Sequence, residues 1–132
     1  MDGSNLNDTT APTLITRAAV WVGPDTTVRD AAGLMQTEDI GALLVRGPHG
    51  TVGVLSERDV VAAVAEGAGV DATKVEEICT WEVVTVSPAM PLADVARTML
   101  DAEIRHLPVE LEGHATEMIS ERDVLQAYAA AR

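Results

Sequence analysis

The sequence of 132 residues predicts an α/β (α+β) fold, built from two tandem β-α-β-β-α repeats related by a pseudo-twofold axis. The main observation is that the pentapeptide Ser56–Val60 recurs unchanged at Ser120–Val124, an offset of 64 residues. At this offset residues 12–66 and 76–130 share 17 identities in 55 positions without a gap. Because a unit this small does not bury its apolar faces alone, we expect the two copies to pack on each other.

In the first copy, a short strand at 20–22 is ended by Pro24. A helix follows, because Val28, Ala31, Ala32 and Met35 recur with the spacing of one helix face. Segments 42–45 and 51–55 flank turn residues and predict a hairpin. A second helix is expected to begin at the pentapeptide.

The second copy repeats this order. A strand at 84–86 is ended by Pro88, and Leu92, Val95, Ala96 and Met99 repeat the helical spacing. Segments 107–109 and 118–119 predict a hairpin around Gly113, and the second pentapeptide opens the last helix.

These elements divide the chain into a disordered tail at 1–11, a first repeat at 12–68, a linker at 69–77 and a second repeat at 78–132. Within the linker, Thr73–Glu76 has the pattern of a capping box.

Charge excludes several function classes. Nine basic side chains against 21 acidic ones give a formal charge of −12, which disfavours nucleic acid and anionic membranes as partners.

The single cysteine, Cys79, excludes an internal disulfide and a multi-cysteine zinc site. Without a signal peptide or an apolar run of membrane-spanning length, the expected location is cytoplasmic. His49 and His114 are expected to be solvated loop residues, and no metal site is predicted.

The ordered motifs of both copies resemble a known family. Each copy has an apolar-Thr pair, a Val-x-Val-x-Pro strand, an apolar helix and a strand that leads into Ser-Glu-Arg-Asp, and copy two has Leu107-Pro108-Val109. The chain therefore resembles a tandem pair of cystathionine β-synthase (CBS) domains, a Bateman module, over residues 12–130. Nothing outside this match suggests a catalytic domain, so we expect a stand-alone regulatory protein.

The resemblance implies a regulatory ligand of adenosyl type (AMP, ADP, ATP, NAD or S-adenosylmethionine) in clefts between the repeats. Asp59 and Asp123 would accept hydrogen bonds from ribose hydroxyls, and the serines three residues before them add a hydroxyl beside helix N–H groups. The ligand-binding residues that the resemblance implies are Thr16, Ser56, Arg58, Asp59, Thr80, Arg105, His106, Pro108, Ser120, Arg122 and Asp123.

A purely structural explanation accompanies this one, because Ser-x-x-Asp at a strand-to-helix junction is also a helix cap, and the two roles can coexist. The copies differ at Gly53, which becomes Glu117 in copy two, so we expect unequal sites, with the Ser56/Asp59 site the better one for ribose.

The sequence predicts no enzyme and no catalytic cofactor, because it has no nucleophile triad, phosphate-binding glycine loop or recognisable acid pair. The alternative to a ligand sensor is a ligand-free dimerisation or protein-interaction module.

In either case we expect a homodimer, because the second helices carry more apolar side chains than one sheet face needs: Val60, Val61, Val64, Val124, Leu125 and Tyr128. The sequence does not identify the regulated protein partner.

Overall fold

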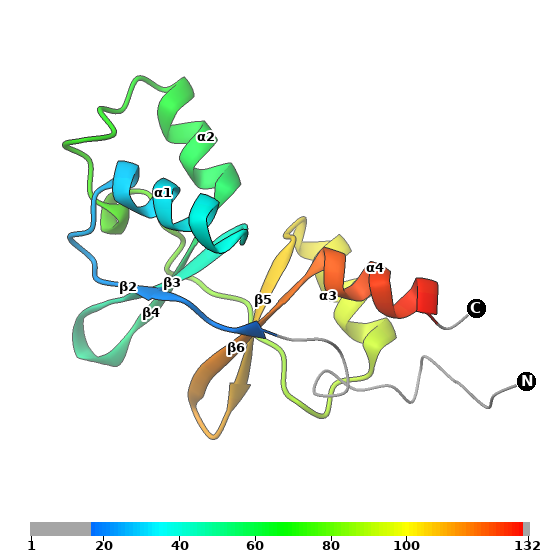
Figure 1. The fold of residues 1–132 in the computed structure, drawn as a ribbon. Helices are drawn as coiled ribbons and strands as arrows, with labels where there is room; N and C mark the ends of the chain where they lie inside the picture. Colours follow the sequence, from blue (N-terminus) through cyan, green and yellow to red (C-terminus); the bar gives the residue numbers. More distant parts are fainter. Residues whose placement is uncertain (1–16, 131–132) are drawn as a thin grey trace, which may run out of the picture. The chain divides into compact units, whose positions relative to one another are not determined.

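A computed structural model describes residues 17–130, which form two compact units (Figure 1). One unit is residues 20–83, and the other combines residues 17–19 with residues 84–130. The tail expected at 1–11 and the candidate ligand residue Thr16 lie outside the described residues.

The unit of residues 20–83 has a three-stranded sheet in the order β2-β3-β4. Strand β2 (Trp21–Val22) pairs in parallel with β3 (Ala42–Arg46), which pairs antiparallel with β4 (Val52–Ser56). Helices α1 (Val28–Glu38) and α2 (Glu57–Ala65) pack beside this sheet (Figure 1). Its core consists of Val22, Ala31, Met35, Leu43, Val45, Leu55 and Val75.

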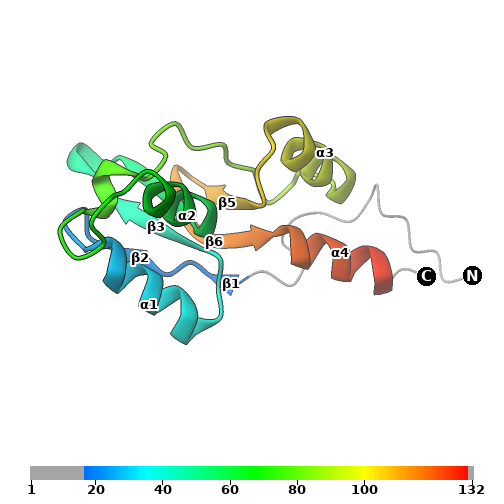
Figure 2. The ribbon, with the colours of Figure 1, turned by 90° about the horizontal axis from the view of Figure 1, so that it is seen from above.

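The other unit has the sheet order β1-β6-β5, from β1 (Arg17–Ala18), β6 (His114–Ser120) and β5 (His106–Leu111). Helices α3 (Leu92–Ala102) and α4 (Glu121–Ala130) complete it, and β6 continues directly into α4 (Figure 2). Glu112 and Gly113 both have positive φ, 54° and 81°, as a two-residue hairpin turn requires. The core consists of Val86, Leu92, Val95, Met99, Leu107, Val109, Ile119 and Val124.

The predicted element order is confirmed, with one strand much shorter than expected. In the first copy Leu44 N–H donates to the Val20 carbonyl at 2.9 Å, which extends the pairing of β2. The equivalent of Leu44 is Pro108, which has no N–H to donate. The strand predicted at 84–86 is therefore reduced to a single parallel bridge between Val86 and Val109.

The segment at 69–77 packs on the start of α1. Val28 N–H donates to the Thr73 carbonyl at 2.9 Å, and Val75, at the start of the short 3-10 helix η3 (Val75–Glu77), is fully buried. The predicted capping pattern at Thr73–Glu76 is one residue too early, because Lys74 N–H donates to the Glu77 carboxylate at 2.7 Å.

Each sheet is completed by a segment that the sequence repeat assigns to the other copy. Arg17 and Ala18 pair with Met118 and Glu117 on β6. Thr80, which lies in the second repeat by sequence, bridges Val54 on β4 within the unit of residues 20–83. The compact units and the sequence repeats therefore have different boundaries.

Candidate ligand-binding site

The first candidate junction is where β4 runs into α2. Ser56 has an extended backbone (φ −106°, ψ 163°), and its Oγ accepts from Asp59 N–H at 3.2 Å. Asp59 Oδ2 in turn accepts from Ser56 N–H at 2.8 Å and from the Ser56 hydroxyl at 3.1 Å. The two residues form a complete capping box, so the structural role predicted for Ser-x-x-Asp is confirmed here.

The second junction, where β6 runs into α4, has the same arrangement. Ser120 N–H donates to Asp123 Oδ2 at 2.8 Å, and Asp123 N–H donates to Ser120 Oγ at 3.1 Å. Asp123 is 5% exposed and is the one buried charged side chain within residues 17–130. Its burial is tolerated because the helix N-terminus favours a negative charge and supplies hydrogen-bond donors.

Around the first junction the fold brings together Ser56, Asp59 and Thr80. Thr80 and Val54 exchange two backbone hydrogen bonds of 2.9 Å each, which hold Thr80 beside the strand that ends at Ser56. The residue opposite Ser56 on β3 is the small, buried Ala42. Arg58 is exposed on the first turn of α2.

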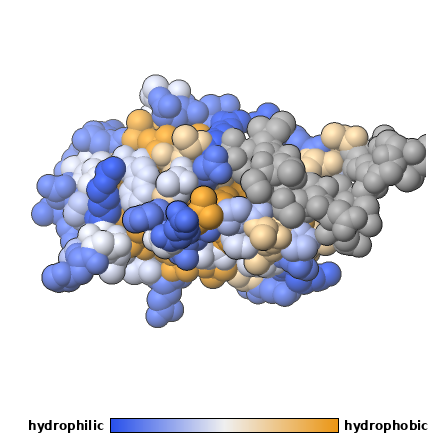
Figure 3. All heavy atoms as spheres, turned by 90° about the horizontal axis from the view of Figure 1, so that it is seen from below, coloured by the Kyte–Doolittle hydropathy of each residue, from blue (hydrophilic) through white to orange (hydrophobic). Residues whose placement is uncertain are grey.

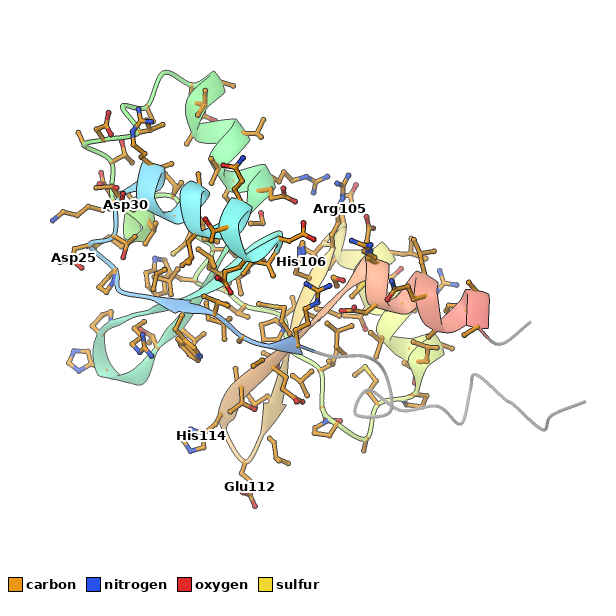
Figure 4. All side chains as sticks on the ribbon, viewed as in Figure 1. Asp25, Asp30, Arg105, His106, Glu112 and His114 are labelled. Atoms are coloured by element: carbon orange, nitrogen blue, oxygen red, sulfur yellow. The ribbon has the colours of Figure 1, made fainter. Side chains whose placement is uncertain are left out.

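Around the second junction the fold brings together more basic groups. His106 is opposite Ser120 across β5 and β6, and the Arg105 carbonyl accepts from Glu121 N–H at 2.8 Å. Figure 4 shows Arg105 and His106 at the end of β5 where the chain enters from α3. The Arg105 guanidinium lies 3.7 Å from the Glu121 carboxylate, with both side chains well exposed. Arg122 is exposed on the first turn of α4, and Pro108 lies two residues along β5, opposite Met118.

The space above Gly53 is filled by the protein itself. A Cβ atom built on Gly53 would lie 2.9 Å from Cys79 Sγ and 2.9 Å from Trp81 Cε3. Gly53 therefore makes room for Cys79 and Trp81 of the same unit. Glu117, its counterpart, is half-buried on β6, opposite Val109 and Ala18.

Cys79 is not an activated thiol. Burial, together with the negative charge of Asp59, raises the pKa of the Cys79 thiol to about 11. Cys79 is a half-buried side chain that packs against the core of its unit.

The two loop histidines are exposed in the hairpin turns, and Figure 4 shows His114 near the tip of the β5-β6 hairpin. Within residues 17–130, no group of three His, Cys, Asp or Glu side chains is placed to hold a metal ion. Over the same residues, no helix has the length and apolar character needed to cross a membrane.

The contacts of Trp81 were missed. Its indole lies against Gly47 and Gly53, and its Nε1 donates to the Glu76 carbonyl at 3.2 Å. A signal was present in the sequence, because the positions equivalent to both glycines and the tryptophan hold Leu111, Glu117 and Arg17, all three in the other compact unit.

Comparison with known proteins places these features in a family. The CBS domain family matches residues 13–66 and 75–130, so the chain belongs to the CBS-domain proteins and carries two copies in tandem. A mitochondrial CBS domain-containing protein of Arabidopsis thaliana, CBSX3, is 33% identical over 114 residues; this match covers 82% of the chain and 55% of that relative.

Solved structures agree with this assignment. The CBS-domain protein ATU1752 of Agrobacterium tumefaciens superposes with a TM-score of 0.79 at 34% identity, with 85% of each chain covered. The CBS domain pair of the protein MJ0100 shares the fold, with a TM-score of 0.83 at 20% identity, 94% of this chain and 98% of that chain covered. That structure was solved in complex with 5′-methylthioadenosine and S-adenosyl-L-methionine.

Proposed function

We propose that this protein is a regulatory module that binds an adenosyl compound at its Ser-x-x-Asp junctions. The observation that carries the proposal is the duplicated capping box, in which Ser56 and Ser120 donate to a single carboxylate oxygen, Oδ2, of Asp59 and of Asp123. A carboxylate accepts about four hydrogen bonds, so the aspartate that caps the helix can also accept from vicinal ribose hydroxyls.

The choice of an adenosyl ligand is supported by the family and by the MJ0100 complex. Backbone N–H groups at the start of α2 and α4 add a local positive potential in a chain whose formal charge is −12.

The two junctions differ in charge, and we propose that they differ in preference. The second junction has Arg105 and His106 where the first has Gly41 and Ala42. The second junction therefore suits a phosphorylated ligand such as AMP, ADP, ATP or NAD. The first junction, with Arg58 and the hydroxyl of Thr80 nearby, suits the ribose of an uncharged nucleoside or of S-adenosylmethionine.

A second proposal concerns assembly. Of the apolar side chains on the second helices, Val60, Val124 and Tyr128 pack into their own cores, whereas three remain largely exposed. Those three are Val61 at 67%, Val64 at 54% and Leu125 at 65%. On the face drawn in Figure 3, apolar residues likewise reach the surface between hydrophilic ones. We propose that a second copy of the chain covers the exposed side chains of α2 and α4 in a homodimer. The same observation favours the alternative function, a ligand-free interaction module.

A thermal-shift screen separates the two functions. We expect one or more of AMP, ATP, NAD, S-adenosylmethionine and 5′-methylthioadenosine to raise the melting temperature, since a ligand at 100 times its Kd adds about 2.7 kcal/mol to the folded state. If none of these compounds raises it while the protein remains dimeric, the interaction module is the better account.

A further inference from the structure

The ring of Trp81 lies over the turn end of the β3-β4 hairpin in the unit of residues 20–83. A Cβ atom on Gly47 would lie 2.6 Å from Trp81 Cζ3, and one on Gly53 would lie 3.0 Å from the same atom. Gly47 and Gly53 point to the same face of the sheet as the core residue Val45, because Gly53 is directly opposite Val45 and Gly47 lies two residues beyond it. Only glycine at both positions allows the indole to lie this close to the backbone.

The other compact unit shows what stands in place of this contact. Its residues at the three equivalent positions are Leu111, Glu117 and Arg17, so the two glycines and the tryptophan are replaced together. Leu111 is 57% exposed. A side chain on Gly47 would also meet the Thr51 hydroxyl, and one on Gly53 would also meet Cys79 Sγ, so Trp81 is one of the neighbours that require glycine at these positions.

Trp81 is also fixed from its other side. Its Nε1 donates to the Glu76 carbonyl at 3.2 Å, and Cys79, two residues earlier, contacts the core of the unit. Between these two anchors lies Thr80, whose N–H donates to the Val54 carbonyl and whose carbonyl accepts from Val54 N–H. Thr80 therefore lies between two residues, Cys79 and Trp81, whose side chains both contact Gly53 on β4.

We propose that Trp81 is a positioning residue for the ligand of the first junction: by lying over Gly47 and Gly53, it keeps Thr80 in its two backbone hydrogen bonds with Val54, two residues before Ser56. This inference rests on the proposed function for its ligand, and on the hydrogen bonds with Val54 for the placement of Thr80. Trp81 does not need to touch the ligand itself.

The test compares Trp81→Ala with Trp21→Ala, which removes the other indole of the same unit. Trp21 lies on β2 with the Arg46 guanidinium carbon 5.0 Å from its ring centroid, and β3 separates β2 from β4, the strand that Thr80 bridges. For each variant, amide exchange is measured by NMR at Thr80 and Val54, and the affinity for 5′-methylthioadenosine is measured by calorimetry.

We expect Trp81→Ala to accelerate exchange at Thr80 and Val54 by about tenfold or more and to weaken 5′-methylthioadenosine binding by about tenfold, with Trp21→Ala changing neither. Gly53→Ala should weaken binding as Trp81→Ala does, because its methyl group displaces the ring. The double variant should bind no worse than Trp81→Ala, since the two changes act on one contact.

Unchanged amide exchange at Thr80 in folded Trp81→Ala would overturn the inference. If the wild-type protein binds 5′-methylthioadenosine, an unchanged affinity in Trp81→Ala would overturn it as well. If the wild-type protein does not bind 5′-methylthioadenosine, the proposed ligand of this junction is wrong. The exchange rates then decide separately whether Trp81 holds Thr80 in place, and retained protection would refute it.

Discussion

Replacing Asp59 by asparagine separates its two roles, as helix cap and as ligand contact. Asp59 Oδ2 accepts from Ser56 N–H at 2.8 Å and from the Ser56 hydroxyl at 3.1 Å. Asp59→Ala removes both bonds at a half-buried position, so it should cost about 1–2 kcal/mol and lower the melting temperature by about 3–8 °C. Asp59→Asn keeps an oxygen for Ser56 N–H, so we expect it to cost less than about 1 kcal/mol.

Ligand affinity should respond differently from stability. Asparagine presents one neutral acceptor where the carboxylate presents two charged oxygens, so Asp59→Asn should weaken 5′-methylthioadenosine binding by about tenfold. Calorimetric unfolding and calorimetric titration measure the two effects on the same samples.

Thr27→Ala is the matched control, because the Thr27 hydroxyl caps α1 in the same unit by accepting from Asp30 N–H at 3.1 Å. It should lower stability by about 1 kcal/mol and leave affinity unchanged. If Asp59→Asn binds as tightly as the wild type, or if Thr27→Ala weakens binding equally, Asp59 is a helix cap and nothing more.

Three further predictions concern thiol reactivity, assembly and turnover. Because the pKa of Cys79 is raised to about 11, alkylation of Cys79 at pH 8 should be about a hundredfold slower than alkylation of a free cysteine, and its rate should rise with pH up to about that pKa. Asp59→Asn should speed alkylation by removing a nearby negative charge, and a rate equal to that of free cysteine would contradict the burial of the thiol. Val64→Glu should convert the proposed homodimer to monomer in sedimentation equilibrium at moderate salt, whereas Arg97→Glu on the exposed side of α3 should not. A dimer that survives Val64→Glu would refute the proposed surface. The pure protein should not turn over ATP or NAD, and steady release of phosphate or nicotinamide that disappears in Ser56→Ala would show an enzyme instead.

The element order was predictable because the repeat made every local pattern appear twice. Both capping boxes follow from Ser-x-x-Asp alone, since the bonds are local to four residues. Which apolar side chains of the second helices are buried and which are exposed was harder to predict from the sequence. Val60 and Val61 are adjacent and chemically identical, and only the packing of α2 shows that Val60 contacts the core while Val61 is exposed.

Features that depend on contacts far apart in sequence were missed. The loss of a strand at 84–86 depends on Pro108 having no N–H in a neighbouring strand. The indole of Trp81 lies over glycines 28 and 34 residues earlier in the sequence, and nothing in the local pattern of either segment predicts that contact. Pairing of Arg17 and Ala18 with β6, about 100 residues later, is likewise a property of tertiary structure.

Calorimetric titration tests most directly whether the Ser-x-x-Asp junctions bind adenosyl compounds. AMP and 5′-methylthioadenosine are titrated into the wild-type protein and into the Asp59→Asn/Asp123→Asn double variant, which should stay folded because both helices keep an acceptor for the serine N–H. We expect saturable binding of at least one compound to the wild type and loss of that binding in the double variant. No binding of either compound to the wild type, or equal affinity in the double variant, would contradict it.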